Sequence, residues 1–156
     1  MKKLFLSFFL LTGIFVFAHS NYPKKDTTQK KENKKWNVEN PPGTFKEVEF
    51  TTTEGTWMNL DVSPDGTKIV FDMLGDIYSM PITGGQATLL RGGHALEVQP
   101  RFSPDGKKIS FISDSAGGDN IWTMNNNGSD AKQITKEKFR LLNNAVWTAD
   151  GNYLIA

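Results

Sequence analysis

Residues 63–71, Ser-Pro-Asp-Gly-Thr-Lys-Ile-Val-Phe, return forty positions later as residues 103–111, Ser-Pro-Asp-Gly-Lys-Lys-Ile-Ser-Phe. A third and more divergent copy, Thr-Ala-Asp-Gly-Asn-Tyr-Leu-Ile, occupies residues 148–155. Repeats of about 40–45 residues built from short strands are typical of β-propellers, in which each repeat forms one blade. The sequence therefore predicts an all-β fold, a partial β-propeller.

Each full repeat is predicted to fold into four strands, because its apolar positions keep their spacing while the length differences fall in the connections. Blade 1 is expected over residues 57–90, blade 2 over residues 98–135, and the start of blade 3 over residues 145–156. Residues 45–52, rich in aromatic and β-branched side chains, predict a further strand that completes the last blade of a closed ring. The chain is therefore expected to be the front of a longer protein, with the remainder of its propeller as a partner. The ten blade strands are expected over residues 57–62, 68–73, 76–80, 86–90, 98–102, 108–113, 120–125, 131–135, 145–147 and 153–156.

The Ser-Pro-Asp-Gly motif is predicted to form a turn between the first and second strands of each blade. Proline presets φ at the second position of a type I turn, serine suits the first position, and glycine takes the left-handed conformation. Because the motif recurs in each repeat, this structural role is favoured over a catalytic serine beside an acid. Gly84-Gly85 and Asn127-Gly128 predict hairpins between the third and fourth strands. The predicted turn residues are Ser63, Pro64, Asp65, Gly66, Ser103, Pro104, Asp105, Gly106, Asp150 and Gly151.

Large aromatic side chains recur at predicted strand positions. Such rings bury extensive apolar surface when two sheets meet. Packing between blades is therefore favoured over a platform for stacking sugars. The rings concerned are those of Trp57, Tyr78, Trp122, Trp147 and Tyr153.

The first twenty residues predict a secretory signal peptide. Lys2 and Lys3 precede an apolar run over residues 4–18, and Ala18-His19-Ser20 offers small residues for cleavage. The run is shorter than the roughly 20 residues of a membrane span, although a retained N-terminal anchor is the alternative. No transmembrane segment is expected after cleavage, so the protein is expected in the periplasm or outside the cell. Residues 21–44 are expected to form a flexible, Lys-rich linker, with a patch that touches anionic polymers or lipids as the alternative.

The composition excludes several classes of function. The 18 basic and 17 acidic residues give a net charge of +1, which indicates no basic face for nucleic acid. The absence of cysteine excludes a disulfide framework. His94 is the one histidine beyond residue 20, and the chain has no Gly-x-Ser-x-Gly motif. No catalytic residue, metal site or cofactor is therefore expected within this sequence.

The connection between blades 1 and 2 holds the candidate binding residues. Arg91, His94 and Glu97 lie there, within seven positions of one another. Loops carry ligand-binding residues more often than the strands that support them. Because such connections gather at one end of a propeller channel, these residues are expected to contact a ligand or a partner domain.

Residues 57–156 resemble the repeats of TolB-type (WD40-like, PD40) propellers of exported bacterial proteins. Phe102–Phe111, Ile121–Met124 and Ile134-Thr135 match that repeat pattern. The resemblance implies that residues 45–156 form an incomplete TolB-like propeller.

A narrower resemblance concerns the N-terminal propeller of large exported amidohydrolases, in which a metal-dependent (β/α)8 barrel follows. It lies in residues 36–43, 54–62, 75–78 and 99–102. The resemblance implies a C-terminal catalytic domain as a partner, with a divalent metal such as zinc in that domain. The propeller would then dock on the barrel and filter its substrate.

Three functions from different classes follow from these observations. The first is the non-catalytic propeller of an exported amidohydrolase. The second is the propeller of a prolyl-oligopeptidase-type serine peptidase, which gates access to a Ser-His-Asp site. The third is a TolB-like envelope scaffold that binds other proteins or peptides and catalyses nothing. The gene region downstream distinguishes them by a His-x-His motif, a Gly-x-Ser-x-Gly motif, or a stop after the last blade.

We expect the mature protein to begin at Asn21, because the basic start, the apolar run and the small residues around Ser20 direct cleavage after that serine. N-terminal sequencing of the protein recovered from the expressing cells checks this. Recovery of Met1 or Lys2 at the N-terminus would contradict it.

Overall fold

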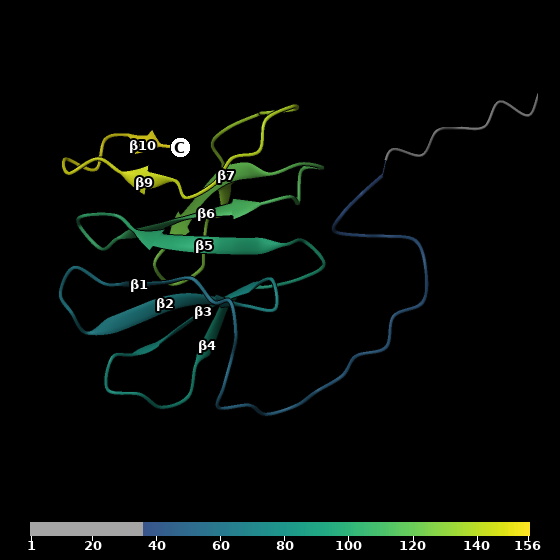
Figure 1. The fold of residues 1–156 in the computed structure, drawn as a ribbon, viewed down its shortest axis with the longest axis horizontal. Coiled ribbons are helices and arrows are strands. Elements are labelled where there is room, and N and C mark those ends of the chain that lie inside the picture. Colours follow the sequence, from purple (N-terminus) through teal and green to yellow (C-terminus); the bar gives the residue numbers. More distant parts are fainter. Residues whose placement is uncertain (1–35) are drawn as a thin grey trace, which may run out of the picture. The chain divides into compact units, whose positions relative to one another are not determined.

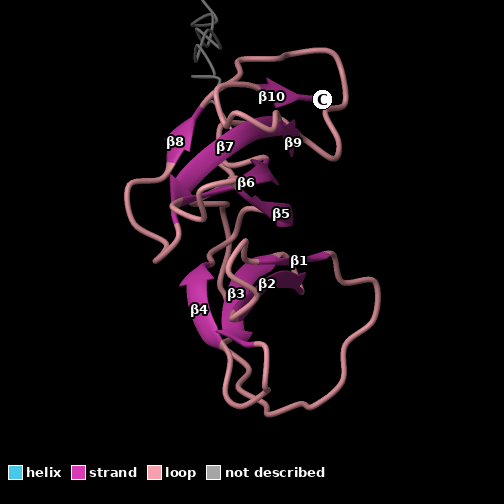
Figure 2. Cartoon of the chain, turned by 90° about the vertical axis from the view of Figure 1, so that its left-hand side faces the viewer, coloured by secondary structure: helices cyan, strands magenta, loops and turns pink. Residues whose placement is uncertain are grey.

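The computed structural model describes residues 36–156, and regular structure within this range consists of strands alone (Figures 1 and 2). The predicted signal peptide and most of the predicted linker lie outside the described residues. Blade 1 contains β1 (Leu60–Val62), β2 (Lys68–Met73), β3 (Asp76–Pro81) and β4 (Thr88–Arg91), and blade 2 contains β5 (Glu97–Phe102), β6 (Lys108–Ser113), β7 (Asn120–Asn125) and β8 (Lys132–Gln133). A hairpin of β9 (Val146–Trp147) and β10 (Leu154–Ile155) follows.

Each blade is an antiparallel sheet whose four strands pair in chain order. The two sheets lie face to face, and the β9–β10 hairpin covers the other face of blade 2 (Figure 1). The prediction of a partial propeller, with two four-stranded blades and the start of a third, is confirmed.

Three expectations about local structure are wrong. Residues 45–52 form no strand, because no described strand pairs with them. The first strand of blade 1 begins at Leu60 rather than at Trp57, whose φ of 59° interrupts an extended backbone. The Trp57 side chain is 99% exposed and so does not pack between blades.

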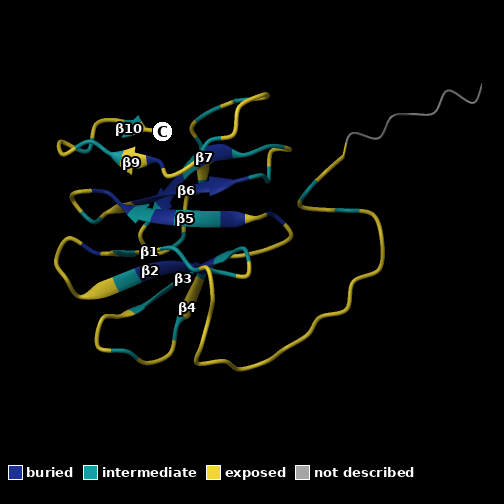
Figure 3. Cartoon of the chain, viewed as in Figure 1, coloured by how far each residue is buried: buried dark blue, intermediate teal, exposed yellow. Residues whose placement is uncertain are grey.

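The main apolar core lies between the two blades. Val70 and Ile77 of blade 1 face an apolar surface of blade 2, and all six side chains of this cluster are buried (Figure 3). Removal of apolar area from water stabilises the fold by about 25 cal/mol per Å². The blades are therefore held together chiefly by their own sheet faces. The blade 2 residues of this cluster are Phe102, Ile109, Phe111 and Met124.

Blade 2 is apolar on both faces. Ile112 and Ile121 point away from blade 1 and pack with Ala145, which precedes β9. Consequently the central part of β6, from Ile109 to Ser113, is buried without interruption. A strand covered on both faces shows such a continuous run instead of alternation.

The Ser-Pro-Asp-Gly segments form turns with a repeated set of hydrogen bonds. The Ser63 hydroxyl donates to Asp65 Oδ1 at 2.6 Å and accepts from the Lys68 backbone N–H at 2.9 Å. The bond from the Ser63 hydroxyl, followed by those from the Thr67 N–H and hydroxyl, lowers the pKa of Asp65 to about 2. Ser103 makes the same two bonds with Asp105 and Lys108.

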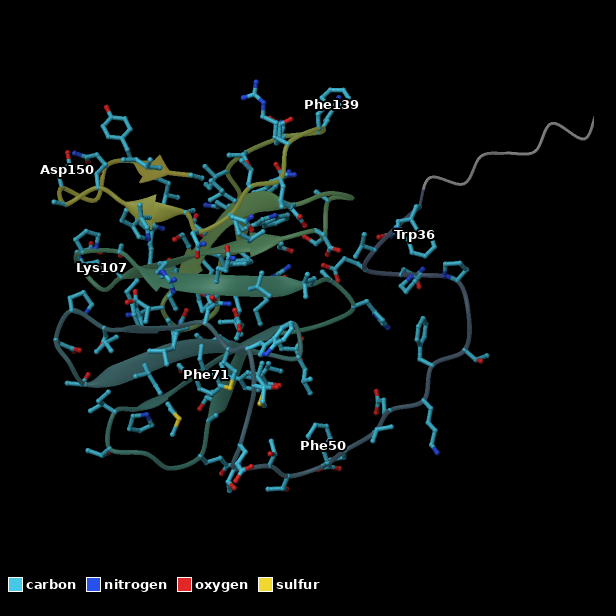
Figure 4. All side chains as sticks on the ribbon, viewed as in Figure 1. Trp36, Phe50, Phe71, Lys107, Phe139 and Asp150 are labelled. Atoms are coloured by element: carbon cyan, nitrogen blue, oxygen red, sulfur yellow. The ribbon has the colours of Figure 1, made fainter. Side chains whose placement is uncertain are left out.

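Successive turns stack along one end of the sheets, where Figure 4 labels Lys107 and Asp150. We call this end the turn end. A Cβ atom added to Gly106 would lie 3.3 Å from Pro64 Cδ, and one added to Gly151 would lie 3.7 Å from Pro104 Cδ. Each turn glycine thus seats the proline of the preceding blade, with φ values of 69° and 71° for the two glycines.

Gly128 lies against blade 1 with no space for a side chain. It belongs to the hairpin between β7 and β8, and an added Cβ atom would meet the Leu90 carbonyl oxygen at 2.3 Å. Its φ is 85°. Gly84 is the equivalent residue of blade 1, with a φ of 89° and nothing within 4 Å of an added Cβ atom.

We expect Gly128→Ala to lower the free energy of unfolding by about 3 kcal/mol or more, because it combines a left-handed backbone with a clash against blade 1. Gly84→Ala carries the backbone strain alone and should cost about 1 kcal/mol. Urea denaturation of the two mature proteins measures the difference. Equal losses would show that Gly128 does not seat the blades.

Candidate functional site

The candidate site lies at the end of the sheets opposite the turn end. Arg91 closes β4 and Glu97 opens β5, with His94 in the connection between them. The register places Arg91 beside Ile77 at the start of β3, and Glu97 beside Ser113 at the close of β6. The connections between blades therefore meet here, and we call this the connection end.

Arg91 and Glu97 form a partly buried ion pair. Arg91 Nε donates to Glu97 Oε1, and the Glu97 side chain is 2% exposed. The Ser113 hydroxyl donates to the same oxygen at 3.3 Å, while Glu97 Oε2 has no hydrogen-bond partner among the described residues. Burial raises the pKa of Glu97, and the charge of Arg91 opposes that rise.

Aromatic rings of blade 2 hold the other side of Arg91. The guanidinium carbon lies 5.8 Å from the ring centroid of Phe111 and 5.7 Å from that of Trp122. At these distances the rings attract the cation. Arg91 Nη2 is directed elsewhere, toward Glu39 Oε1 at 3.7 Å. The arginine is thus positioned by blade 2 and offers one edge to a group outside the blades.

His94 lies apart from this ion pair. Its ring centroid is 4.5 Å from that of Phe45, with the rings tilted by 55°. The side chain is exposed, and among residues 36–156 no hydrogen bond joins it to a serine or a carboxylate. The structure therefore brings Arg91 and Glu97 together and places His94 beside the segment that precedes blade 1.

A second recess at the connection end involves the loop that leads to blade 3. It is an open cavity of about 560 Å³ between residues 116–120 and residues 136–141. Asn120 shapes the loop, since its Oδ1 atom accepts from the Glu137 N–H at 2.7 Å. Phe139 projects from the loop and is 96% exposed (Figure 4).

The sequence analysis missed a polar network between blades. Buried Asp72 accepts hydrogen bonds from the Asn59 N–H at 2.9 Å and from the Gln99 N–H at 2.7 Å. Gln99 Oε1 in turn accepts from the Asn144 N–H at 2.6 Å. A signal was present, because Asn59, Gln99 and Asn144 each lie four positions before the first residue of the turn motif. The backbone N–H groups of Gln99 and Asn144 each bond to a side chain of the preceding blade, and these bonds fix the register of one blade on the next.

In residues 36–156 no group of three or more histidine, cysteine, aspartate or glutamate side chains could hold a metal ion. The same part of the chain has no helix long and apolar enough to cross a membrane.

The stacked four-stranded sheets define a β-propeller. Residues 44–156 match the family described as the TolB beta propeller domain, PD40. The match covers well over half of the chain, so the protein belongs to this family.

Relatives within the family carry different names. Over 91 residues the chain is 30% identical to Tricorn protease homolog 1 of Streptomyces coelicolor, which covers 58% of this chain and 8% of that protein. It is 28% identical over 105 residues to the uncharacterized peptidase YuxL of Bacillus subtilis, covering 60% of this chain and 16% of the peptidase. The crystal structure of TolB from Acinetobacter baumannii matches with 27% identity and a TM-score of 0.55, covering 65% of this chain and 26% of that one. The chain thus spans about a quarter or less of these proteins.

We expect Arg91→Ala to lower the free energy of unfolding by about 3–5 kcal/mol near pH 8, because it leaves the Glu97 carboxylate buried without its cation. Adding Glu97→Gln should recover most of this loss, since burying a neutral amide costs less free energy than burying a charge. Urea denaturation of both variants measures the effect.

The loss should shrink as the pH falls. The pKa of Glu97 is raised in the fold and rises further without Arg91, so the folded variant takes up a proton before the unfolded chain does. The Arg91→Ala loss should therefore be smaller at pH 5 than at pH 8. A loss that is independent of pH, with no recovery from Glu97→Gln, would contradict this account of the ion pair.

Proposed function

We propose that this chain is the non-catalytic propeller region of an exported protein and that its connection end binds peptide segments. The observation that carries the proposal is the placement of Arg91. Glu97 and two aromatic rings hold the guanidinium from within blade 2, and one edge is presented outside the blades to a carboxylate. Arginine binds carboxylates well because its planar fork matches their geometry.

The named relatives favour a peptidase-type context. Two of the relatives described above carry the names of a protease and a peptidase. In such a protein the propeller would gate access of peptides to a catalytic domain. The amidohydrolase, which the sequence analysis places first, gains no support from these relatives, and a zinc-containing C-terminal domain belongs to that hypothesis alone.

A TolB-like scaffold is the second candidate. It is supported by the match to the TolB structure of Acinetobacter baumannii. Here the connection end would bind another envelope protein instead of a substrate. In either case export is proposed on the basis of the signal sequence over residues 1–20. Sequencing the downstream gene region distinguishes the candidates by the motif or stop codon found there.

We expect the mature chain to bind peptides without cleaving them. A tryptic digest of casein serves as the probe, and hydrogen–deuterium exchange reads out where it binds. Protection should appear in residues 92–96 and 114–119 at the connection end, and not in residues 104–107 at the turn end. Mass spectrometry of the digest after incubation, with and without zinc, should show no new cleavage.

Two results would contradict the proposal. Protection at the turn end alone, or nowhere, would show that the connection end binds no peptide. Hydrolysis that depends on metal or is blocked by a serine reagent would show that the chain is itself catalytic.

A further inference from the structure

A segment of the chain itself lies on the connection end. We call residues 36–45 the strap, and Figure 4 shows its Trp36 near the ends of the sheets. Trp36 and Asn37 line a recess of about 380 Å³ together with residues 115–117. Further along, Glu39 lies 3.7 Å from Arg91, and Phe45 packs on His94. The strap therefore contacts the connections of both blades.

The charges of the strap and of its seat are complementary. Glu39 is the only charged residue among residues 36–45, and Arg91 is the only charged residue of the connection between Leu90 and Leu96. The two lie opposite each other. Pro41 and Pro42 separate the carboxylate from the Phe45 ring and limit the conformations of the intervening chain.

The seat exists independently of the strap. Glu97, Phe111 and Trp122 belong to blade 2 and hold Arg91 without any contribution from residues 36–45. The seat is thus preorganised for a carboxylate, which lowers the cost of binding one.

The strap itself is held weakly. Its Glu39 side chain is 44% exposed, and Phe45 is 59% exposed. Among the described residues, no backbone hydrogen bond joins the strap to a blade. Exposed ion pairs of this kind contribute little to stability. Another peptide with the same groups can therefore replace it.

We infer that Arg91 and His94 form a binding site for acidic peptides that carry an aromatic residue, and that the strap occupies this site in cis. The inference rests on the proposed function, in which the connection end binds peptides. The strap then acts as an internal competitor. An acidic partner segment takes the place of Glu39 on Arg91 and of Phe45 on His94, and the strap is released.

Fluorescence anisotropy with a labelled synthetic peptide tests this inference. The probe is the strap sequence, Trp-Asn-Val-Glu-Asn-Pro-Pro-Gly-Thr-Phe, supplied to the mature protein in trans. We expect a Glu39→Gln, Phe45→Ala double variant, whose strap is released, to bind the probe at least tenfold more tightly than the wild type. A tenfold difference corresponds to a site that the strap fills about nine-tenths of the time.

The controls separate site binding from general attraction. Glu47→Gln removes an exposed carboxylate two positions beyond the strap that forms no ion pair among the described residues, and this variant should bind the probe as the wild type does. A probe with Gln in place of its Glu should lose at least tenfold in affinity for the released variant. This second control changes no residue of the protein and so does not depend on the folding of a site variant.

Each outcome bears on one proposal or on both. Equal binding of the probe to wild type and released variant would overturn the strap inference and leave peptide binding at the connection end intact. The strap inference would also fail if neither protein bound the probe while casein peptides still protected the connection end from hydrogen exchange. If neither probe nor casein peptides bind, both proposals fail.

Discussion

Neighbouring sheets of this protein bury their main apolar side chains against one another, and the rest of the structure depends on that packing. Val70 and Ile77 pack in one cluster with side chains of blade 2, and Ile112 and Ile121 pack in another with Ala145 and Leu154 of the segments around β9 and β10. Close approach of the sheets requires glycine where backbones meet, as at Gly128 against Leu90. It also brings buried Asp72 within reach of the Gln99 backbone N–H. The polar network therefore depends on the apolar one.

The same packing makes the two ends of the sheets chemically different. At the turn end, Asp65 Oδ1 is held within its own turn by hydrogen bonds from the Ser63 hydroxyl and the Thr67 N–H. At the connection end the chain must pass from the outer strand of one blade to the inner strand of the next. These longer passages expose side chains such as those of His94 and Phe139, and the proposed binding site lies there.

The repeat motif was sufficient to predict the blades because turn chemistry and strand pairing are local. Residues 68–73 and 108–113 were both expected as strands and are strands. The expected strand over residues 45–52 fails because pairing needs a partner that local composition does not supply. For the site, the sequence predicted only that Arg91, His94 and Glu97 lie in the same connection. The contact of Arg91 with Phe111 and Trp122 depends on how one sheet lies on the next, which no spacing within the connection reveals.

Residues that differ between the repeats are more informative about function than the residues that the repeats share. A shared propeller does not fix chemistry, since proteins named as peptidases and as TolB all match it. Counted back from the turn motif, Glu97 corresponds to Trp57 in blade 1 and to Leu142 before blade 3, while Arg91 corresponds to Lys136. Blade 2 packs against the β9–β10 hairpin without such an ion pair. Burying a carboxylate costs free energy that purely apolar packing avoids. The ion pair is therefore a feature of the contact between blades 1 and 2 that packing does not require, and it directs one edge of Arg91 toward Glu39 outside the blades.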